Sequence, residues 1–164
     1  MASTPPLSAR PPSSAPPPLS APPPLSGHKA TVTAFYQEMW NKADTAIVAR
    51  LLHGDVTFRG SLGSRSTGHD GVAGYVRSVT AALGGFTCEL RQMVEEGDLV
   101  AVRLGFRGQH RGTFMGFHPT GQRLAWDGSA HFAFRGDRIC DIWVLGDMHG
   151  LIRQLQRNAG AIPA

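Results

Sequence analysis

The sequence predicts an α+β domain in which helices come first, a strongly curved antiparallel sheet follows and a short helix closes the chain. Two observations support this prediction. Three segments between residues 32 and 83 have apolar residues at helical spacing, and through most of residues 86–145 the apolar residues recur at every second position. Strands of ten or more residues coil as they twist, so we expect the sheet to bend over the helices and enclose a pocket.

Three helices are expected before the sheet. The second covers about residues 44–52 with Asp44 as its N-cap, and it leads through a short strand at 56–59 into a Gly-rich and Ser-rich loop at 60–68. The third begins at Asp70, a residue type that favours the N-cap. The first and third helices each carry an apolar stripe, made of Val32, Phe35, Tyr36, Met39 and Trp40 in the first and of Val72, Tyr75, Val76, Val79 and Leu83 in the third.

Four longer strands and a final helix complete the expected domain. The alternation of apolar and polar residues predicts strands at about 86–95, 99–110, 122–134 and 138–145, and short turns containing Gly and Asp separate the first strand from the second and the third from the fourth. The last helix is marked by one apolar stripe, which consists of Met148, Leu151, Ile152 and Leu155.

The first 26 residues differ in composition from the rest of the chain. They hold ten of the twelve prolines, and the hexapeptide APPPLS occurs twice in tandem, at residues 15–20 and 21–26. Proline fixes φ and lacks an amide donor, so such a segment favours polyproline II or coil. We expect a disordered Pro-rich tail over residues 1–26 and one folded domain over residues 27–164. A docking peptide for a proline-binding domain is the alternative for the tail.

Composition and motifs argue against several functional classes. The net charge is +4, but the arginines are scattered and form no basic run, so we expect no nucleic-acid partner. No apolar run is long enough to span a membrane, and no secretory signal is recognisable, so we expect a cytoplasmic protein. The spacing of Cys88, Cys140 and the seven histidines matches no metal site, and no nucleotide-binding loop occurs. We therefore expect neither a metal nor another cofactor.

Asp147 is the first candidate for chemistry. It follows the apolar run 142–145 and Gly146, and it immediately precedes the last helix. One interpretation is an N-cap, whose hydrogen bonds to backbone amides lower the pKa of a carboxyl group. The other is a general acid/base, whose pKa would be raised by apolar neighbours such as Trp143. The sequence alone leaves both open.

Two histidines and several aromatic residues are further candidates. His131 shares a polar strand face with Asp127 and Ser129, and this face borders either solvent or a cavity. Facing a cavity, an imidazole could polarise a carbonyl or move a proton near neutral pH. His110 ends the preceding strand and is a weaker candidate. The residues expected to bind an aromatic or other hydrophobic substrate are Tyr36, Trp40, Phe58, His110, Phe117 and Trp143.

Several motifs resemble the SnoaL-like polyketide cyclases. The stretch HRGTFMGFHPTG at residues 110–121 is similar to the family pattern H-x-G-x-F-x-G-x-x-P-T-G. Further matches are WDG at 126–128, Trp143 with Asp147, and GLIRQL at 150–155. The likeness extends upstream through Phe35-Tyr36 and Trp40-Asn41, so it covers about residues 30 to 156 and leaves out the tail.

This resemblance implies a cone of the nuclear transport factor 2 (NTF2) type that works without a cofactor. It implies a homodimer or homotetramer built through the outer face of the sheet. It also implies an intramolecular aldol ring closure on a small hydrophobic, polyketide-like substrate, with Asp147 as the general acid/base and His131 assisting. The role of His131 depends on the strand register, because a slip of one residue would turn its side chain to the other face of the sheet.

The same scaffold also hosts other functions. Epoxide-opening enzymes, isomerases and hydroxylases therefore remain alternatives, as does a non-catalytic module that binds a hydrophobic ligand or mediates dimerisation. In the non-catalytic module we expect Asp147 to turn its oxygens to backbone amides and the cavity to contain no polar group.

Overall fold

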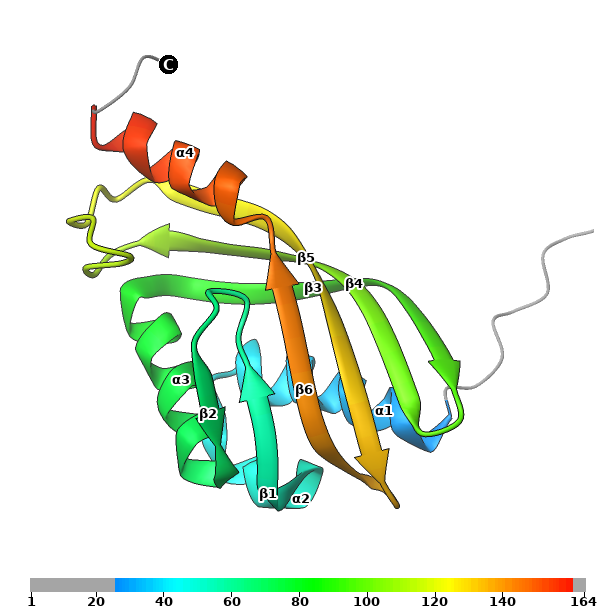
Figure 1. Cartoon of the computed structure of the whole chain (residues 1–164). Coiled ribbons are helices and arrows are strands. Elements are labelled where there is room, and N and C mark those ends of the chain that lie inside the picture. Colours follow the sequence, from blue (N-terminus) through cyan, green and yellow to red (C-terminus); the bar gives the residue numbers. More distant parts are fainter. Residues whose placement is uncertain (1–25, 161–164) are drawn as a thin grey trace, which may run out of the picture.

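The computed structural model describes residues 26–160, which form one curved six-stranded sheet and the helices packed against it (Figure 1). The strand order is β2-β1-β6-β5-β4-β3. All neighbouring strands are antiparallel except β1 and β6, which are parallel. The strands are β1 (Leu52–Arg59), β2 (Arg65–Thr67), β3 (Leu83–Glu96), β4 (Leu99–His110), β5 (Arg123–Arg135) and β6 (Arg138–Gly146).

The helices lie where the apolar spacing predicts them, with different ends. Helix α1 (Gly27–Ala34) continues directly into a π-helical turn at Phe35–Trp40, and a 3₁₀ turn at Thr45–Ile47 precedes the short α2 (Val48–Leu51). Asp44 caps that 3₁₀ turn by accepting a hydrogen bond from the amide of Ala46 at 2.9 Å. Helices α3 (Gly68–Ala82) and α4 (Met148–Asn158) complete the set. Figure 1 shows α1 and α3 against one face of the sheet and α4 beyond the end of β6.

The predicted α+β architecture is confirmed, with local corrections. The segment expected as a loop at 60–68 contains the short strand β2, and Leu83, expected on the third helix, begins β3. Helix α3 begins at Gly68 rather than at Asp70, which lies in its first turn. Strand β1 begins four residues earlier than expected, at Leu52. It pairs in parallel with β6, a neighbour far along the sequence, so its local sequence pattern contains no sign of this pairing.

The start of the described chain lies close to the expected domain boundary. Ser26 caps α1, because its hydroxyl oxygen accepts a hydrogen bond from the amide of Lys29 at 3.2 Å. The first helix therefore uses one residue that the sequence interpretation assigned to the tail. The rest of the expected tail, residues 1–25, lies outside the described residues.

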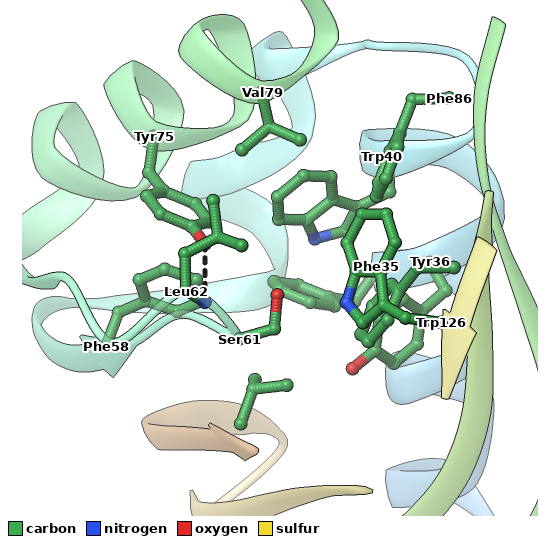
Figure 2. A pocket seen from close by; sticks show the side chains of 12 residues that line it. Phe35, Tyr36, Trp40, Phe58, Ser61, Leu62, Tyr75, Val79, Phe86 and Trp126 are labelled. Carbon is green, nitrogen blue, oxygen red and sulfur yellow. Dashed lines mark hydrogen bonds between the residues drawn. The ribbon is translucent and has the colours of Figure 1, made fainter. Parts of the chain in front are cut away.

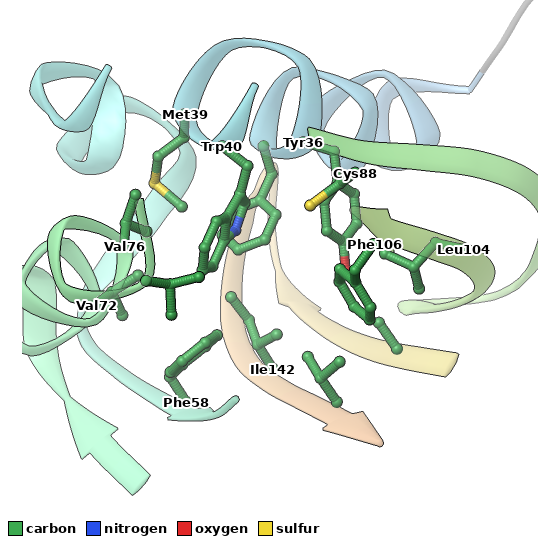
Figure 3. Close-up of a cluster of buried hydrophobic side chains, with 14 of the residues drawn as sticks. Tyr36, Met39, Trp40, Phe58, Val72, Val76, Cys88, Leu104, Phe106 and Ile142 are labelled. Atoms are coloured by element: carbon green, nitrogen blue, oxygen red, sulfur yellow. The ribbon is translucent and has the colours of Figure 1, made fainter. Parts of the chain in front are cut away.

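The core lies between the helices and the inner face of the sheet (Figure 3). The even-numbered residues of β4 and β5 point inward, and Phe132 is one of them. Its ring meets the rings of Phe35 and Tyr36 edge to face, at centroid distances of 5.4 Å and 5.8 Å. The odd-numbered residues, His131 among them, form the outer face of the sheet.

Helix α4 follows β6 and packs against β5. The side-chain amide of Gln154 accepts a hydrogen bond from the backbone N–H of Ala125 at 3.0 Å and donates one to its carbonyl at 2.7 Å. Leu151 and Leu155 of the same helix are fully buried. This docking fixes the chain around Asp147, the residue between β6 and α4.

Residues 26–160 contain neither a membrane-spanning helix nor a metal-binding cluster. No helix in this range is long and apolar enough to cross a membrane. No group of three or more His, Cys, Asp or Glu side chains in the same range is arranged to hold a metal ion.

Candidate functional site

An aromatic cavity lies between the helices and the inner face of the sheet (Figure 2). The cavity is small: its volume is about 20 Å³, which is room for about one water. Most lining side chains are buried, and the partly exposed ones are Ser61, Leu62 and Tyr75. The cavity therefore approaches the surface at the loop between β1 and β2. The lining consists of Phe35, Tyr36, Trp40, Phe58, Ser61, Leu62, Tyr75, Val79, Phe86, Phe106, Trp126 and Val144.

The lining carries hydroxyl and indole groups but no charged side chain. None of the described residues that line the cavity is Asp, Glu, His, Lys or Arg. Burial raises the pKa of Tyr36 well above its ordinary value, and burial also raises the pKa of Tyr75. Both phenols therefore stay protonated near neutral pH. The cavity offers hydrogen-bond donors, and it offers no carboxylate or imidazole to act as a base.

The loop at residues 60–64 covers the cavity entrance. The hydroxyl of Tyr75 accepts a long hydrogen bond of 3.4 Å from the amide of Leu62 (Figure 2). A Cβ atom added at Gly60 would lie 2.3 Å from the Tyr75 ring, so this ring can lie over the loop only because residue 60 has no side chain. A single long hydrogen bond stabilises the loop only weakly. A ligand can enter the cavity here only if Leu62 moves.

Three of the six residues expected to bind substrate line this cavity. They are Tyr36 and Trp40, from the π-helical turn, and Phe58, from β1. Their side chains project into one space from different elements (Figure 2). Their role in substrate binding stays a prediction.

The other three expected binding residues lie elsewhere. Trp143 is on the outer face of β6, 38% exposed, with the guanidinium of Arg59 5.2 Å from its ring centre. His110 is fully buried outside the cavity lining, with Nδ1 3.2 Å from the hydroxyl oxygen of Thr120. Phe117 lies in the loop after β4, where its backbone pairs with that of Phe114. In these positions His110 and Phe117 shape the loop at 111–122.

Asp147 lies beside the cavity but does not line it. Its carboxylate oxygen Oδ1 accepts a hydrogen bond from the amide of Gly150 at 2.9 Å, so Asp147 caps α4. Among the described residues, none donates a hydrogen bond to Oδ2. The side chain is exposed in a shallow depression that also includes Phe106 and Trp126, two residues of the cavity lining.

Gly146 connects Asp147 to the cavity wall. A Cβ atom at this position would lie 3.2 Å from Ser61 and from the indole of Trp126. The backbone just before Asp147 is therefore packed against two lining residues. This close approach places the backbone of Gly146 at the cavity wall, one residue before Asp147, whose side chain lies in the outer depression.

The structure does not bring His131 to Asp147. His131 is exposed on the outer face of β5, and its ring meets that of Trp143 at a centroid distance of 5.6 Å. The amide of Asp147 bonds to the carbonyl of Asp127, four residues away from His131 on the same strand. Four strand residues span roughly 13 Å. The polar face of β5 is the outer one, where His131 borders a surface depression rather than the aromatic cavity.

The sequence interpretation did not select most of the cavity wall. Trp126, Phe106 and Val144 are inward residues of their strands, and Phe86 and Val79 belong to apolar patterns. Their spacing marks them as core, and spacing does not distinguish a core side chain from one that borders a cavity. Only the tryptophans among them could have indicated a binding site from sequence, because a buried indole N–H needs a hydrogen-bond acceptor.

The chain is similar to known proteins in both sequence and fold. The family model of the SnoaL-like polyketide cyclases matches residues 30–155. No curated protein sequence matches the chain significantly.

Several solved structures share the fold. One is a proposed polyketide cyclase from Acidithiobacillus ferrooxidans, with 22% identity, a TM-score of 0.73 and coverage of 82% of this chain and 97% of that chain. IdmH, a proposed polyketide cyclase from Streptomyces antibioticus, has 25% identity and a TM-score of 0.68, and the match covers 77% of this chain and 96% of that chain. AclR, a proposed hydroxylase from Streptomyces galilaeus, has 23% identity and a TM-score of 0.69 over 84% of this chain and 87% of that chain.

The fold comparison and the family match agree. The matches extend over almost the whole length of the solved structures. The predicted NTF2-like cone is therefore confirmed. The family model extends from the first helix into α4 and includes every residue that lines the cavity. The chain belongs to the SnoaL-like polyketide cyclase family.

Proposed function

We propose that the protein closes a ring in a small, apolar, polyketide-like substrate by an intramolecular aldol reaction. The observation that carries this proposal is the aromatic cavity, which combines apolar walls with several polar atoms and has no charged side chain among the described residues that line it. Such a lining suits a neutral carbon chain with ketone groups better than an ion, because a buried unpaired charge is costly. The family membership supports the same class of reaction.

The proposed reaction needs one group that moves a proton. Asp147 takes a proton from a methylene carbon between two carbonyls, and the resulting enolate carbon forms a bond to the carbon of a third carbonyl, a ketone elsewhere in the same molecule. The proton then passes to the new alkoxide oxygen, so no redox partner is required. Two features support this role. The Oδ2 atom accepts no hydrogen bond from the described residues, and Gly146 packs against the cavity wall.

His131 has a smaller part in the proposal. On the outer face of β5 it is distant from the cavity lining. Any contribution of its imidazole to the reaction would act through the strand or through a neighbouring subunit in the expected homo-oligomer.

A non-catalytic binding module is the second candidate, and one observation favours it. Asp147 turns Oδ1 to a backbone amide, as expected for a residue that serves only as a cap. However, the module was also expected to lack polar groups in the cavity. The hydroxyls of Tyr36 and Ser61 lie in its wall (Figure 2), and this second observation favours an enzyme.

Filling the cavity entrance should test whether the cavity is the reaction site. We expect Leu62→Trp to lower the rate of ring closure of an aromatic β-keto ester that carries a further ketone by about tenfold or more, because overfilling a packed site costs about 1–3 kcal/mol. Product formation is followed by chromatography. The matched control is Ser64→Trp, at an exposed position of the same loop outside the lining. Equal rates for wild type and Leu62→Trp would place the reaction elsewhere.

A further inference from the structure

Three buried polar atoms in the cavity wall have no partner among the described residues. They are the hydroxyl of Tyr36 and the indole nitrogens of Trp40 and Trp126. These side chains are only 2%, 6% and 5% exposed. Figure 2 shows the two indole nitrogens on the cavity side of their rings. Unpaired buried polar atoms are uncommon in proteins, so three of them around one cavity require an explanation.

The chemistry of these atoms identifies what would satisfy them. An indole N–H donates a hydrogen bond and cannot accept one. The phenol of Tyr36 stays protonated because burial raises its pKa, so it can donate as well. Two groups that only donate and one that can donate need an acceptor. A carbonyl oxygen has two lone pairs for two of these donors, and an enolate oxygen has three lone pairs, enough for all of them. The cavity has room for about one water, so the ligand oxygen takes that space and Leu62 has to move for the rest of the ligand to enter.

The donors are held in place by their neighbours. The Trp40 ring lies 5.5 Å from that of Phe86 and 5.9 Å from that of Tyr75. The Trp126 ring lies 5.2 Å from Phe106 and 6.0 Å from Phe86. Donors fixed by packing in an apolar site stabilise a developing negative charge without having to reorganise. Packing thus orients the two indoles for a ligand.

The absence of charge in the described lining narrows the ligand further. A carboxylate or phosphate in this cavity would lose its water without gaining a cation, which is unfavourable. A neutral ketone loses less on burial and gains the donated hydrogen bonds. If its carbonyl becomes an enolate, the same donors bind the oxygen more strongly, because hydrogen bonds to an ionised acceptor are stronger.

We propose that the indole N–H groups of Trp126 and Trp40, together with the Tyr36 hydroxyl, bind the carbonyl oxygen of an aromatic ketone. This inference rests on the proposed function and specifies the functional group that the substrate presents to the cavity. The three side chains bind the carbonyl that becomes an enolate. They provide the donor function that sequence reasoning assigned to His131.

The test compares acetophenone with ethylbenzene, in which the carbonyl is replaced by a methylene. Isothermal titration of the full chain should show acetophenone binding about tenfold more tightly, the equivalent of one or two net hydrogen bonds. Trp126→Phe should remove most of this preference and leave ethylbenzene binding unchanged. Trp40→Phe and Tyr36→Phe should each remove part of it. Trp143→Phe, which deletes an indole on the outer face, is the matched control and should keep the preference.

The infrared carbonyl stretch of bound acetophenone gives a second readout. It should shift to lower frequency in the wild type and shift less in Trp126→Phe, an effect that a change in packing alone would not produce. Equal affinity for the two compounds, equal loss of both in Trp126→Phe, or binding of neither compound would overturn the inference. Acetophenone has one carbonyl and cannot close a ring, so this binding result does not depend on whether the cyclase assay succeeds.

Discussion

Replacing Asp147 by asparagine is expected to lower the rate of ring closure by about 10²-fold to 10⁴-fold, the usual contribution of a positioned proton-transfer group. Asparagine caps a helix about as well as aspartate, so the hydrogen bond to the amide of Gly150 can be kept. The melting temperature should therefore barely change. The measurement pairs steady-state turnover with thermal unfolding of the same preparations.

Asp127→Asn is the matched control for this experiment. Asp127 lies in the same outer depression as Asp147, but its carboxylate is paired with Arg91 at 2.7 Å. We expect this control to keep full turnover, and His131→Ala to lose less than Asp147→Asn. Wild-type turnover in Asp147→Asn would contradict the acid/base role and favour the binding module.

Phe132→Ala should produce the largest loss of stability, about 3–5 kcal/mol. Phe132 is fully buried at the centre of β5. Its ring meets Phe35 and Tyr36 edge to face, so truncation removes contacts with the helix that carries Tyr36 and Trp40. Urea unfolding monitored by circular dichroism measures the change.

The neighbouring residue is the control for Phe132→Ala. His131 points from the same strand to the outer face and is exposed, so His131→Ala should change the free energy of unfolding by no more than about 0.5 kcal/mol. Comparable losses in the two variants would mean that the inward and outward faces of β5 are assigned incorrectly.

The fold could be predicted from the sequence because burial repeats with a clear period. The alternation in β4 and the helical spacing from Val32 to Trp40 each follow from facing one core. The parallel pairing of β1 with β6 could not be predicted in this way, because it joins strands about 80 residues apart. The π-helical turn at Phe35–Trp40 also leaves no mark in the apolar spacing.

The site was predictable only in part, for a physical reason. Tyr36, Trp40 and Phe58 line the cavity, as expected for aromatic residues on inward faces. His131 and Trp143 were candidates because a polar or aromatic residue in a strand can face either solvent or a cavity. Only the curvature of the sheet decides which face encloses space, and it directs both residues outward. Trp126 was not a candidate, because its inward position suggested only a packing role, yet it lines the cavity.

The most direct test of the aromatic cavity as the ligand site uses the three tryptophans of the chain. Each tryptophan gives one indole signal in a ¹H–¹⁵N correlation spectrum of the full chain, and single Trp→Phe variants assign the three signals. On titration with acetophenone, the signals of Trp40 and Trp126 should move, while that of the outward-facing Trp143 stays in place. Movement of the Trp143 signal alone, or of none of the three at saturating ligand, would contradict the assignment of the cavity as the binding site.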